Sequence, residues 1–188
     1  KLTIVKGDIR NKEKISKFFK NVECVFHLAA IAEIVPSIEN PDEYFTTNVN
    51  GTLNILDSLK NIDKKIITVM ITSDKAYDNL EWPWGYREND SLGGKDPYSA
   101  SKGMAELAIH SYVNSFFSTS DSNIRIGVAR AGNVIGGGDW AADRIVPDCM
   151  VAWANNKSVK IRSPYSTRPW QHVLEPLSGY LYLAKNLD

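Results

Sequence analysis

The run IITVMITS at residues 66–73 decides the fold class. It is short, continuously apolar and rich in β-branched residues, which is typical of a strand buried on both faces. Such strands belong to parallel sheets, because crossover helices cover both faces of those sheets. The run ends in the polar stretch TSDK at 72–75, where the strand gives way to a loop. We therefore predict a parallel sheet and extend the assignment outward from it.

Helical and strand-like segments alternate on either side of this run. In residues 41–60 the apolar side chains recur at three- and four-residue steps, which predicts a helix. Pro97 suits the first turn of a second long helix, predicted over 97–117. Further strands are expected at 2–5, 22–30, 124–132 and 158–162, and further helices at 11–20, 145–155 and 177–188. This alternation predicts βαβ units, and therefore an α/β fold with a mostly parallel sheet.

The composition is that of an ordinary globular protein and excludes several classes. The chain has 188 residues, 43% of them hydrophobic, and 22 Lys plus Arg balance 22 Asp plus Glu. This balance disfavours a dedicated nucleic-acid binder, and no apolar run reaches the roughly 18 residues of a transmembrane helix. The first residues lack a signal-peptide pattern, and Cys24 with Cys149 cannot make a disulfide framework. We therefore expect two buried thiols and a cytoplasmic protein. Because the chain starts without Met, we also expect it to be a piece of a longer protein.

Chemically versatile residues stand at the ends of the predicted strands. Right-handed crossovers bring the carboxyl ends of parallel strands to one edge of the sheet, where ligands of such folds bind. His27 stands there too, but no second His lies at metal-ligand spacing, so no metal site is predicted. The other residues at this edge are Asp8, Ala29, Ala30, Ser73, Asp74, Lys75, Gly132 and Asn133.

Tyr98 and Lys102 form the first candidate catalytic pair. At a spacing of i, i+4 both side chains lie on one face of a helix. A phenol titrates near about 10, and a neighbouring ammonium favours the phenolate, which makes a usable base near neutral pH. The same spacing also occurs in exposed helix pairs without chemistry, so the pair alone leaves both interpretations open.

Residues 72–75 form the second candidate group. A hydroxyl, a carboxylate and an amine lie side by side where the strand ends in its loop. Alone, this segment also fits a turn with a side-chain cap. The two groups together are more specific, because the strand before the Tyr98 helix ends in the hydroxyl and acid that a shared active site needs.

Seven short motifs are spread over nearly the whole chain. They are GDIR at 7–10, HLAA at 27–30, NVNGT at 48–52, TSDKAY at 72–77, YSASK at 98–102, RAGNVIGGGDW at 130–140 and RPWQHV at 168–173. In this order and at these spacings they resemble the extended short-chain dehydrogenase/reductase superfamily, in its nucleotide-sugar branch. The longer segments 72–102 and 130–148 are similar to the CDP-glucose 4,6-dehydratase group of that superfamily.

The resemblance implies a Rossmann-like sheet with helices on both faces. It assigns residues 1–132 to a partial dinucleotide-binding domain and residues 133–188 to a partial nucleotide-sugar-binding region. The superfamily's first βαβ unit carries a Gly-rich turn that holds the cofactor pyrophosphate. No such turn lies at the start of this sequence, and Gly136 to Gly138 follow a late strand instead. We therefore expect the chain to lack the first βαβ unit and to be inactive alone.

The activity that the resemblance implies is that of a lyase. CDP-glucose would become CDP-4-keto-6-deoxyglucose by hydride transfer to NAD, elimination of water across C5 and C6, and return of the hydride. Tyr98 would take the proton of the C4 hydroxyl, Lys102 would hold the nicotinamide ribose, and Ser73 would bond the C4 oxygen. Asp74 and Lys75 stand where the C5 base and the C6 acid belong. Lys75 fits either that base or an electrostatic stabiliser of the enolate.

The resemblance also implies two sets of binding residues. The cofactor-binding set is Asp8, Ile9, Leu28, Ala29, Ala30, Asn48, Tyr98, Lys102 and Ala131. The substrate-binding set is Ser73, Asn133, Arg144 and Arg168. Plainer interpretations are a turn residue at Asp8, a bond within its own helix at Asn48 and a solvated charge at Arg144. The segment IAEIVP at 31–36 departs from the group, and a buried acid at Glu33 would alter the sugar pocket.

Two other functions stay open at this point. A NAD-dependent nucleotide-sugar 4-epimerase would use Tyr98 and Lys102 without the acid/base pair, and a non-catalytic nucleotide-binding relative would keep only the fold. Detection of a 4-keto-6-deoxy sugar separates the dehydratase from the epimerase. The resemblance further implies a homodimer through helices at 42–61 and 97–118, with a nucleotide-sugar as ligand and no nucleic-acid or membrane partner.

Overall fold

The computed structural model describes residues 2–119, 122–141 and 143–188. The chain divides into two compact units. The first consists of Lys1–Arg130 together with Tyr180–Asp188, and the second of Ala131–Gly179. We describe each unit by itself.

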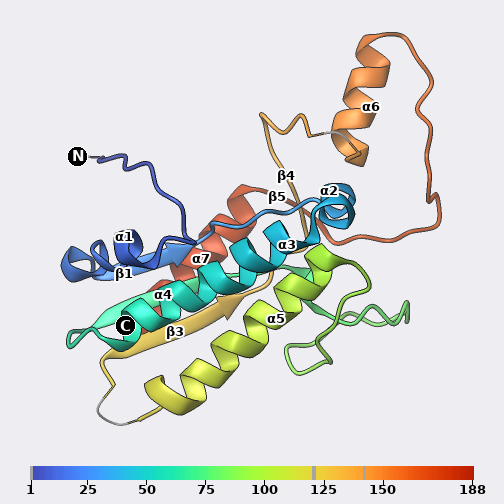
Figure 1. The fold of residues 1–188 in the computed structure, drawn as a ribbon. Helices are drawn as coiled ribbons and strands as arrows, with labels where there is room; N and C mark the ends of the chain where they lie inside the picture. The colour runs from blue at the N-terminus through green and yellow to red at the C-terminus, as the bar shows by residue number, and fades with distance from the viewer. Residues whose placement is uncertain (1, 120–121, 142) are drawn as a thin grey trace. The chain divides into compact units, whose positions relative to one another are not determined.

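A three-stranded parallel sheet forms the centre of the first unit (Figure 1). Its strands are β1 (Cys24–His27), β2 (Ile66–Ile71) and β3 (Ile124–Ala129), in the spatial order β1-β2-β3. The register places Thr68 of β2 beside Val25 on one side and Ile126 on the other. β2 is the central strand, and its residues Val69 and Met70 are fully buried. The parallel sheet predicted from the apolar run is confirmed.

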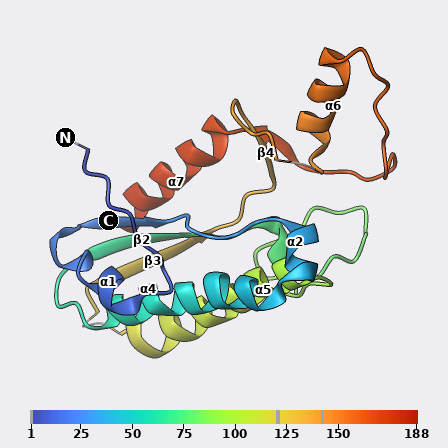
Figure 2. The ribbon, with the colours of Figure 1, turned by 45° about the horizontal axis from the view of Figure 1, so that its top comes forward.

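Helices cover both faces of this sheet, as predicted (Figure 2). α4 (Gly51–Lys60) and α5 (Pro97–Tyr112) lie side by side on one face, and a cluster that includes Leu56, Met70 and Ile109 fills the space beneath them. On the other face, the C-terminal part of α7 (Leu174–Leu187) packs against β3. A methyl group added at Gly127 would lie 2.8 Å from Leu187 Cδ1, so the glycine lets this helix approach.

The two long helices match their predicted extents but contain unpredicted π-helical turns. The helix predicted over 41–60 consists of α3 (Pro41–Tyr44), the π-helical η2 (Phe45–Asn50) and α4. α5 continues into the π-helical η4 (Val113–Phe117), which completes the predicted range 97–117. Shorter elements are α1 (Lys12–Ser16), η1 (Phe19–Asn21), α2 (Ile34–Glu39) and η3 (Asp74–Ala76).

The second unit contains a two-stranded parallel sheet and one helix. β4 (Asn133–Ile135) pairs with β5 (Trp170–His172), and α6 (Ile145–Ala154) confirms the helix predicted over 145–155. Gly132 lies against Pro169, whose Cγ would be 2.5 Å from an added Cβ, so the two chain segments are closely apposed there. β4 and β5 were not predicted, because three residues are too few to display a period.

Two predicted strands are wrong. Residues 2–5 and 158–162 form neither a strand nor a helix. A strand is stabilised by hydrogen bonds to a neighbouring strand, and within the described residues neither segment has one. Leu2 and Ile4 are consequently 85% and 87% exposed, despite an apolar pattern that favours a strand.

The burial predicted for the two cysteines is also wrong. Cys24 is exposed because it opens β1, an edge strand of the described sheet, and Cys149 is half-buried on α6. Among the described helices, none combines the length and the apolar character required to cross a membrane.

Candidate functional site

Tyr98 and Lys102 occupy the first two turns of α5. Asp96 caps this helix, since its carboxylate accepts a hydrogen bond of 2.9 Å from the Ser99 backbone N–H, and Pro97 takes the first position. The helix therefore starts where Tyr98 and Lys102 lie one turn apart on one face. Each residue is only 7% exposed, which rules out the interpretation of an exposed helix pair.

Burial shifts the protonation equilibrium of Lys102. Desolvation lowers the pKa of its ammonium from 10.5 to about 8, and the negative charge of Glu106 opposes that effect. The ammonium lines a small cavity with room for about one water molecule, together with His27, Ala29, Ala30 and Thr72. Across the described ranges, no carboxylate lies within ion-pair distance of Lys102.

These features fit the ribose end of a dinucleotide. A buried ammonium without a carboxylate partner is suited to donating hydrogen bonds to hydroxyl or anionic oxygens of a ligand. The small side chains of Ala29 and Ala30, at the end of β1, leave the backbone open to close approach. Leu28 beside them is 54% exposed, although it is a large apolar residue.

The residues Ser73, Asp74 and Lys75 follow β2 directly and form a single turn. The Ser73 hydroxyl caps η3: it accepts from the Lys75 backbone N–H at 3.2 Å and donates to Asp74 Oδ1 at 3.1 Å. All three residues are half-buried. The sequence allowed either a capped turn or a catalytic group at these residues. The structure has the capped turn, and the side chains of Asp74 and Lys75 stay accessible in it.

The turn 73–75 lies directly against α5. A Cβ added at Gly103 would be 3.4 Å from the Ala76 carbonyl oxygen, so the helix backbone packs on the turn. Gly103 immediately follows Lys102 in α5. The structure therefore brings the two candidate groups, which are separated by more than twenty residues of sequence, to adjoining elements at the carboxyl edge of the sheet.

Asn48 bonds across to α5 instead of only within its own helix. Its Nδ2 donates to Ser101 Oγ at 2.8 Å and to the Ile31 carbonyl at 3.0 Å, and its Oδ1 accepts from the Ile31 N–H at 3.0 Å. Asn48 is 3% exposed and belongs to the π-helical turn η2. It thus ties the loop after β1 to the helix that carries Tyr98.

His27 is buried and neutral. Thr52 Oγ1 donates to the Asn48 carbonyl at 2.7 Å, so the 3.3 Å contact between Thr52 Oγ1 and His27 Nε2 assigns the ring proton to Nε2. Burial lowers the pKa of His27 to about 4, and the nearby Lys102 charge acts in the same direction. This is the satisfied strand-end histidine expected from the sequence.

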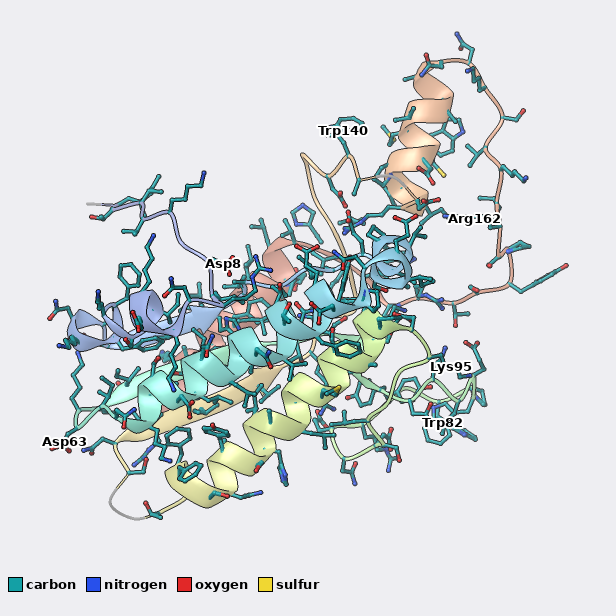
Figure 3. All side chains as sticks on the ribbon, viewed as in Figure 1. Asp8, Asp63, Trp82, Lys95, Trp140 and Arg162 are labelled. Atoms are coloured by element: carbon teal, nitrogen blue, oxygen red, sulfur yellow. The ribbon has the colours of Figure 1, made fainter. Side chains whose placement is uncertain are left out.

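Asp8 and Ile9 lie on the segment before α1 (Figure 3). Asp8 is exposed and ion-paired with Arg10, whose guanidinium lowers the pKa of the carboxyl. Ile9 packs on Gly51, where an added Cβ would be 2.8 Å from Ile9 Cγ1. Asn54 holds the segment by donating to the Ile9 carbonyl at 2.9 Å.

The remaining predicted positions belong to the second unit. Ala131 and Asn133 are half-buried, and Asn133 begins β4. Arg144 is exposed and pairs with Asp139 at 3.0 Å, and Arg168 is exposed and donates to the Thr167 carbonyl at 2.6 Å. The expectation of a buried acid at Glu33 is wrong, because Glu33, the residue directly before α2, is exposed.

Sequence reasoning missed a buried ionic cluster beside the site. Glu106 on α5 accepts hydrogen bonds from Thr72 Oγ1 at 2.5 Å and from Arg130 Nε at 2.7 Å. Its side chain is 4% exposed and that of Arg130 is 17% exposed. The available signal was a charged residue one turn after Lys102, on the same face of the predicted helix as Tyr98 and Lys102.

A family model described as GDP-mannose 4,6 dehydratase matches residues 1–180. A CDP-glucose 4,6-dehydratase of Salmonella typhimurium is 51% identical over 186 residues, covering 96% of this chain and 52% of the relative. A CDP-paratose 2-epimerase of Salmonella typhi is 28% identical, covering 85% of this chain and 49% of the relative. The chain thus spans about half the length of these curated relatives.

Solved structures share the fold. DesIV, a dTDP-glucose 4,6-dehydratase from Streptomyces venezuelae, matches with a TM-score of 0.82 at 21% identity, over 96% of this chain and 54% of that one. A UDP-N-acetylglucosamine 4-epimerase from Methanobrevibacter ruminantium M1 matches with a TM-score of 0.82 at 26% identity, over 98% and 58% of the two chains. The Rossmann-like fold is confirmed by these matches.

Proposed function

The chain belongs to the GDP-mannose 4,6-dehydratase family, and from this membership we propose that the full-length protein is a lyase acting on CDP-glucose. The product would be CDP-4-keto-6-deoxyglucose, with NAD as the bound cofactor. The 51% identity to a CDP-glucose 4,6-dehydratase supports this substrate over other nucleotide-sugars. The observation that carries the proposal is the buried Tyr98 and Lys102 pair, lying against the turn that bears Asp74 and Lys75.

Tyr98 acts as the base for the C4 hydroxyl of the sugar. The Lys102 ammonium favours the phenolate form of its neighbour and offers donors to the nicotinamide ribose. Ser73 bonds the same C4 oxygen and holds it beside the phenol. The NAD that these residues would hold would supply the hydride acceptor for C4 and the hydride donor for C6. The protein orients the reactants and moves one proton at this position.

Asp74 and Lys75 serve the elimination of water. A ketone at C4 acidifies the C5 proton, and loss of the C6 hydroxyl requires an acid while loss of the C5 proton requires a base. Lys75 fits the base, or the cation that stabilises the enolate oxygen, and Asp74 fits the acid. Both side chains are half-buried in the turn that packs on α5, so they belong to the element beside the helix of Tyr98 and are not sealed from solvent.

The binding residues of the proposal divide between the two units. The cofactor is held by Asp8, Ile9, Leu28, Ala29, Ala30, Asn48 and Ala131, besides Tyr98 and Lys102. The nucleotide-sugar is held by Ser73, Asn133, Arg144 and Arg168. Asn48 acts by fixing the loop after β1 to α5, since its amide hydrogens already bond Ser101 and Ile31. Asp8 must exchange Arg10 for an adenine amino group when the dinucleotide binds.

The full-length protein incubated with CDP-glucose and NAD tests the activity. We expect a product lacking one water and carrying a 4-keto-6-deoxy sugar, identified by mass spectrometry and NMR. Recovery of CDP-galactose instead would establish a 4-epimerase and refute the dehydratase. Absence of both reactions in a protein that binds NAD would favour a non-catalytic relative.

The substitution Lys75→Ala tests the division between oxidation and elimination. Removing the amine takes away the proposed base or enolate stabiliser but leaves Tyr98, Lys102 and Ser73 in place. We expect no measurable 4-keto-6-deoxy product, with transfer of a C4 deuterium label to NAD still detectable. Lys95→Ala, an exposed lysine of the following loop, is the matched control and should turn over normally. Normal turnover by Lys75→Ala would remove Lys75 from the mechanism.

We further propose that the protein is a homodimer through helices 42–61 and 97–118 and acts in the cytoplasm. Met104, Leu107 and Phe116 are each at least 40% exposed along α5 and its continuation η4. These three exposed apolar side chains form an apolar stripe along the helix, which favours association with a second copy of the chain. Two cysteines without a disulfide framework favour a reducing compartment.

A further inference from the structure

Glu106 joins three elements at the carboxyl edge of the sheet. It lies on α5 one turn after Lys102, and its carboxylate accepts from Thr72 at the end of β2. Arg130, directly after β3, donates Nε to both carboxylate oxygens at 2.7 and 2.9 Å and also pairs through Nη2. A carboxylate this deeply buried is stable only when its oxygens are satisfied, and here they receive these bonds.

Arg130 extends the cluster to the far side of the 73–75 turn. Its guanidinium lies over the ring of Tyr77 with 4.5 Å between the guanidinium carbon and the ring centroid. Nη1 donates to the Glu88 carbonyl at 3.1 Å. Tyr77 in turn stacks on Tyr86 at 4.8 Å, so the loop before α5 is anchored to the same arginine.

The turn with Ser73, Asp74 and Lys75 is therefore held at both of its ends. Thr72 immediately before it bonds Glu106, and Tyr77 after it lies against the arginine that Glu106 pairs with. Glu106 shares a rigid helix with Tyr98 and Lys102. The Glu106 carboxylate thus links the residues on both sides of the turn to the helix.

We propose that Glu106 is a positioning residue that holds the Asp74 and Lys75 turn in register with Tyr98 on α5, acting through Thr72 and Arg130. This inference rests on the dehydratase proposed above. In the proposed mechanism, oxidation at C4 depends mainly on Tyr98 and Lys102, which α5 carries, and takes one supporting bond from Ser73 of the turn. Elimination depends on Asp74 and Lys75, and both of these belong to the turn. Loosening the turn therefore slows elimination more than oxidation.

The experiment compares Glu106→Gln and Thr72→Val with the wild-type full-length protein on CDP-glucose. We expect kcat to fall roughly 10- to 100-fold with little change in KM. Quenched reactions should hold a larger fraction of sugar as the 4-keto form that still carries its C6 hydroxyl. Hydrogen exchange at the backbone amides of Lys75 and Ala76 should quicken in the unliganded variants, which reports the turn without catalysis.

Matched variants separate positioning from a general loss of stability. Thr68→Val makes the same substitution four residues earlier, within β2, at a buried hydroxyl with no hydrogen-bond partner among the described residues, and should leave activity unchanged. Thr72→Ser keeps the hydroxyl and should restore the wild-type ratio of the two sugars. An unchanged ratio, or unchanged exchange in Glu106→Gln, would overturn the role of Glu106. An inactive wild type would instead refute the proposed function.

Discussion

At the scale of single residues, the site contains ionisable groups whose pKa values are lowered by burial. Lys102 is a buried ammonium without a carboxylate partner in the described structure, and His27 is a neutral imidazole beside it. The sequence predicted the Tyr98 and Lys102 pair because their four-residue spacing is local. It did not predict Glu106 with Arg130, because their contact depends on where two strands end in space.

The burial of Lys102 should cost stability at neutral pH. Its folded-state pKa of about 8 lies below its ordinary 10.5, so the unfolded chain binds more protons between these values. Stability should rise with pH from about 8 to 10.5, and the penalty below pH 8 is roughly 3 kcal/mol. Lys102→Met should therefore stabilise the NAD-free protein by roughly 1–3 kcal/mol at pH 7 while abolishing turnover.

Urea unfolding at pH 7 and at pH 10 checks this expectation. The wild type should gain stability between the two pH values relative to Lys102→Met. Lys95→Met, the same change at an exposed lysine, should match the wild type at both. A Lys102→Met protein that is less stable at pH 7 would show that the ammonium is compensated in the folded state.

At the scale of elements, sequence prediction succeeded for helices and strands that have a long residue pattern. It failed where the formation of a strand depended on pairing with another strand. The apolar run of β2 and the spacing in residues 41–60 and 97–117 each extend over several turns or a whole buried strand. Residues 2–5 have an equally good strand pattern, yet no strand in the described structure pairs with them. The three-residue strand β4 has almost no pattern, yet β5 pairs with it.

Gly94 is an element-scale requirement for the start of α5. A Cβ there would lie 2.7 Å from Ser99 Cβ, and it would meet helix backbone closer still. Gly94→Ala should destabilise the protein by about 1–3 kcal/mol through overpacking against the first turn. Gly85→Ala, in the same loop but with nothing within 4 Å of the added methyl, should be nearly neutral.

Thermal unfolding of the two alanine variants checks this. The turnover number kcat is a second readout. Gly94→Ala should lower kcat below the wild-type value, because Tyr98 lies in the helical turn that the added methyl group would displace. Equal midpoints for the two variants would mean that the loop moves aside without penalty.

At the scale of the whole molecule, the described chain forms two units, and the first unit carries more of the predicted site residues than the second. The pair on α5, the turn after β2 and the loop after β1 belong to the first unit, whereas Asn133, Arg144 and Arg168 belong to the second. The parallel arrangement of the strands in the first unit followed from the alternation of strand-like and helical segments. The resemblance implied a division after residue 132, but it did not imply that the chain returns to the first unit at Tyr180.

The prediction at this scale concerns the association of two copies of the full-length protein. Leu107 is 58% exposed in the apolar stripe of α5. Leu107→Lys should convert the proposed full-length dimer to a monomer, because the proposed interface would bury a lysine from each copy without an acidic partner. Sedimentation at several concentrations measures this, and Leu80→Lys in the loop before α5 is the control. A full-length protein that is monomeric without any substitution would refute the dimer.

The π-helical turn at Phe45–Asn50 has a consequence for how this helix can change over evolutionary time. Such a turn accommodates one additional residue while the α-helical segments on both sides keep their winding. Removing Thr47 would restore regular α-helical winding and, because the extra residue is absorbed within the turn, leave the segments on both sides facing as they do now. Tyr44, whose ring meets that of Tyr98 edge-on, would then keep its contact with α5. A single-codon deletion is therefore tolerated at this turn, whereas one in a regular part of the helix would rotate everything before it by about 100°.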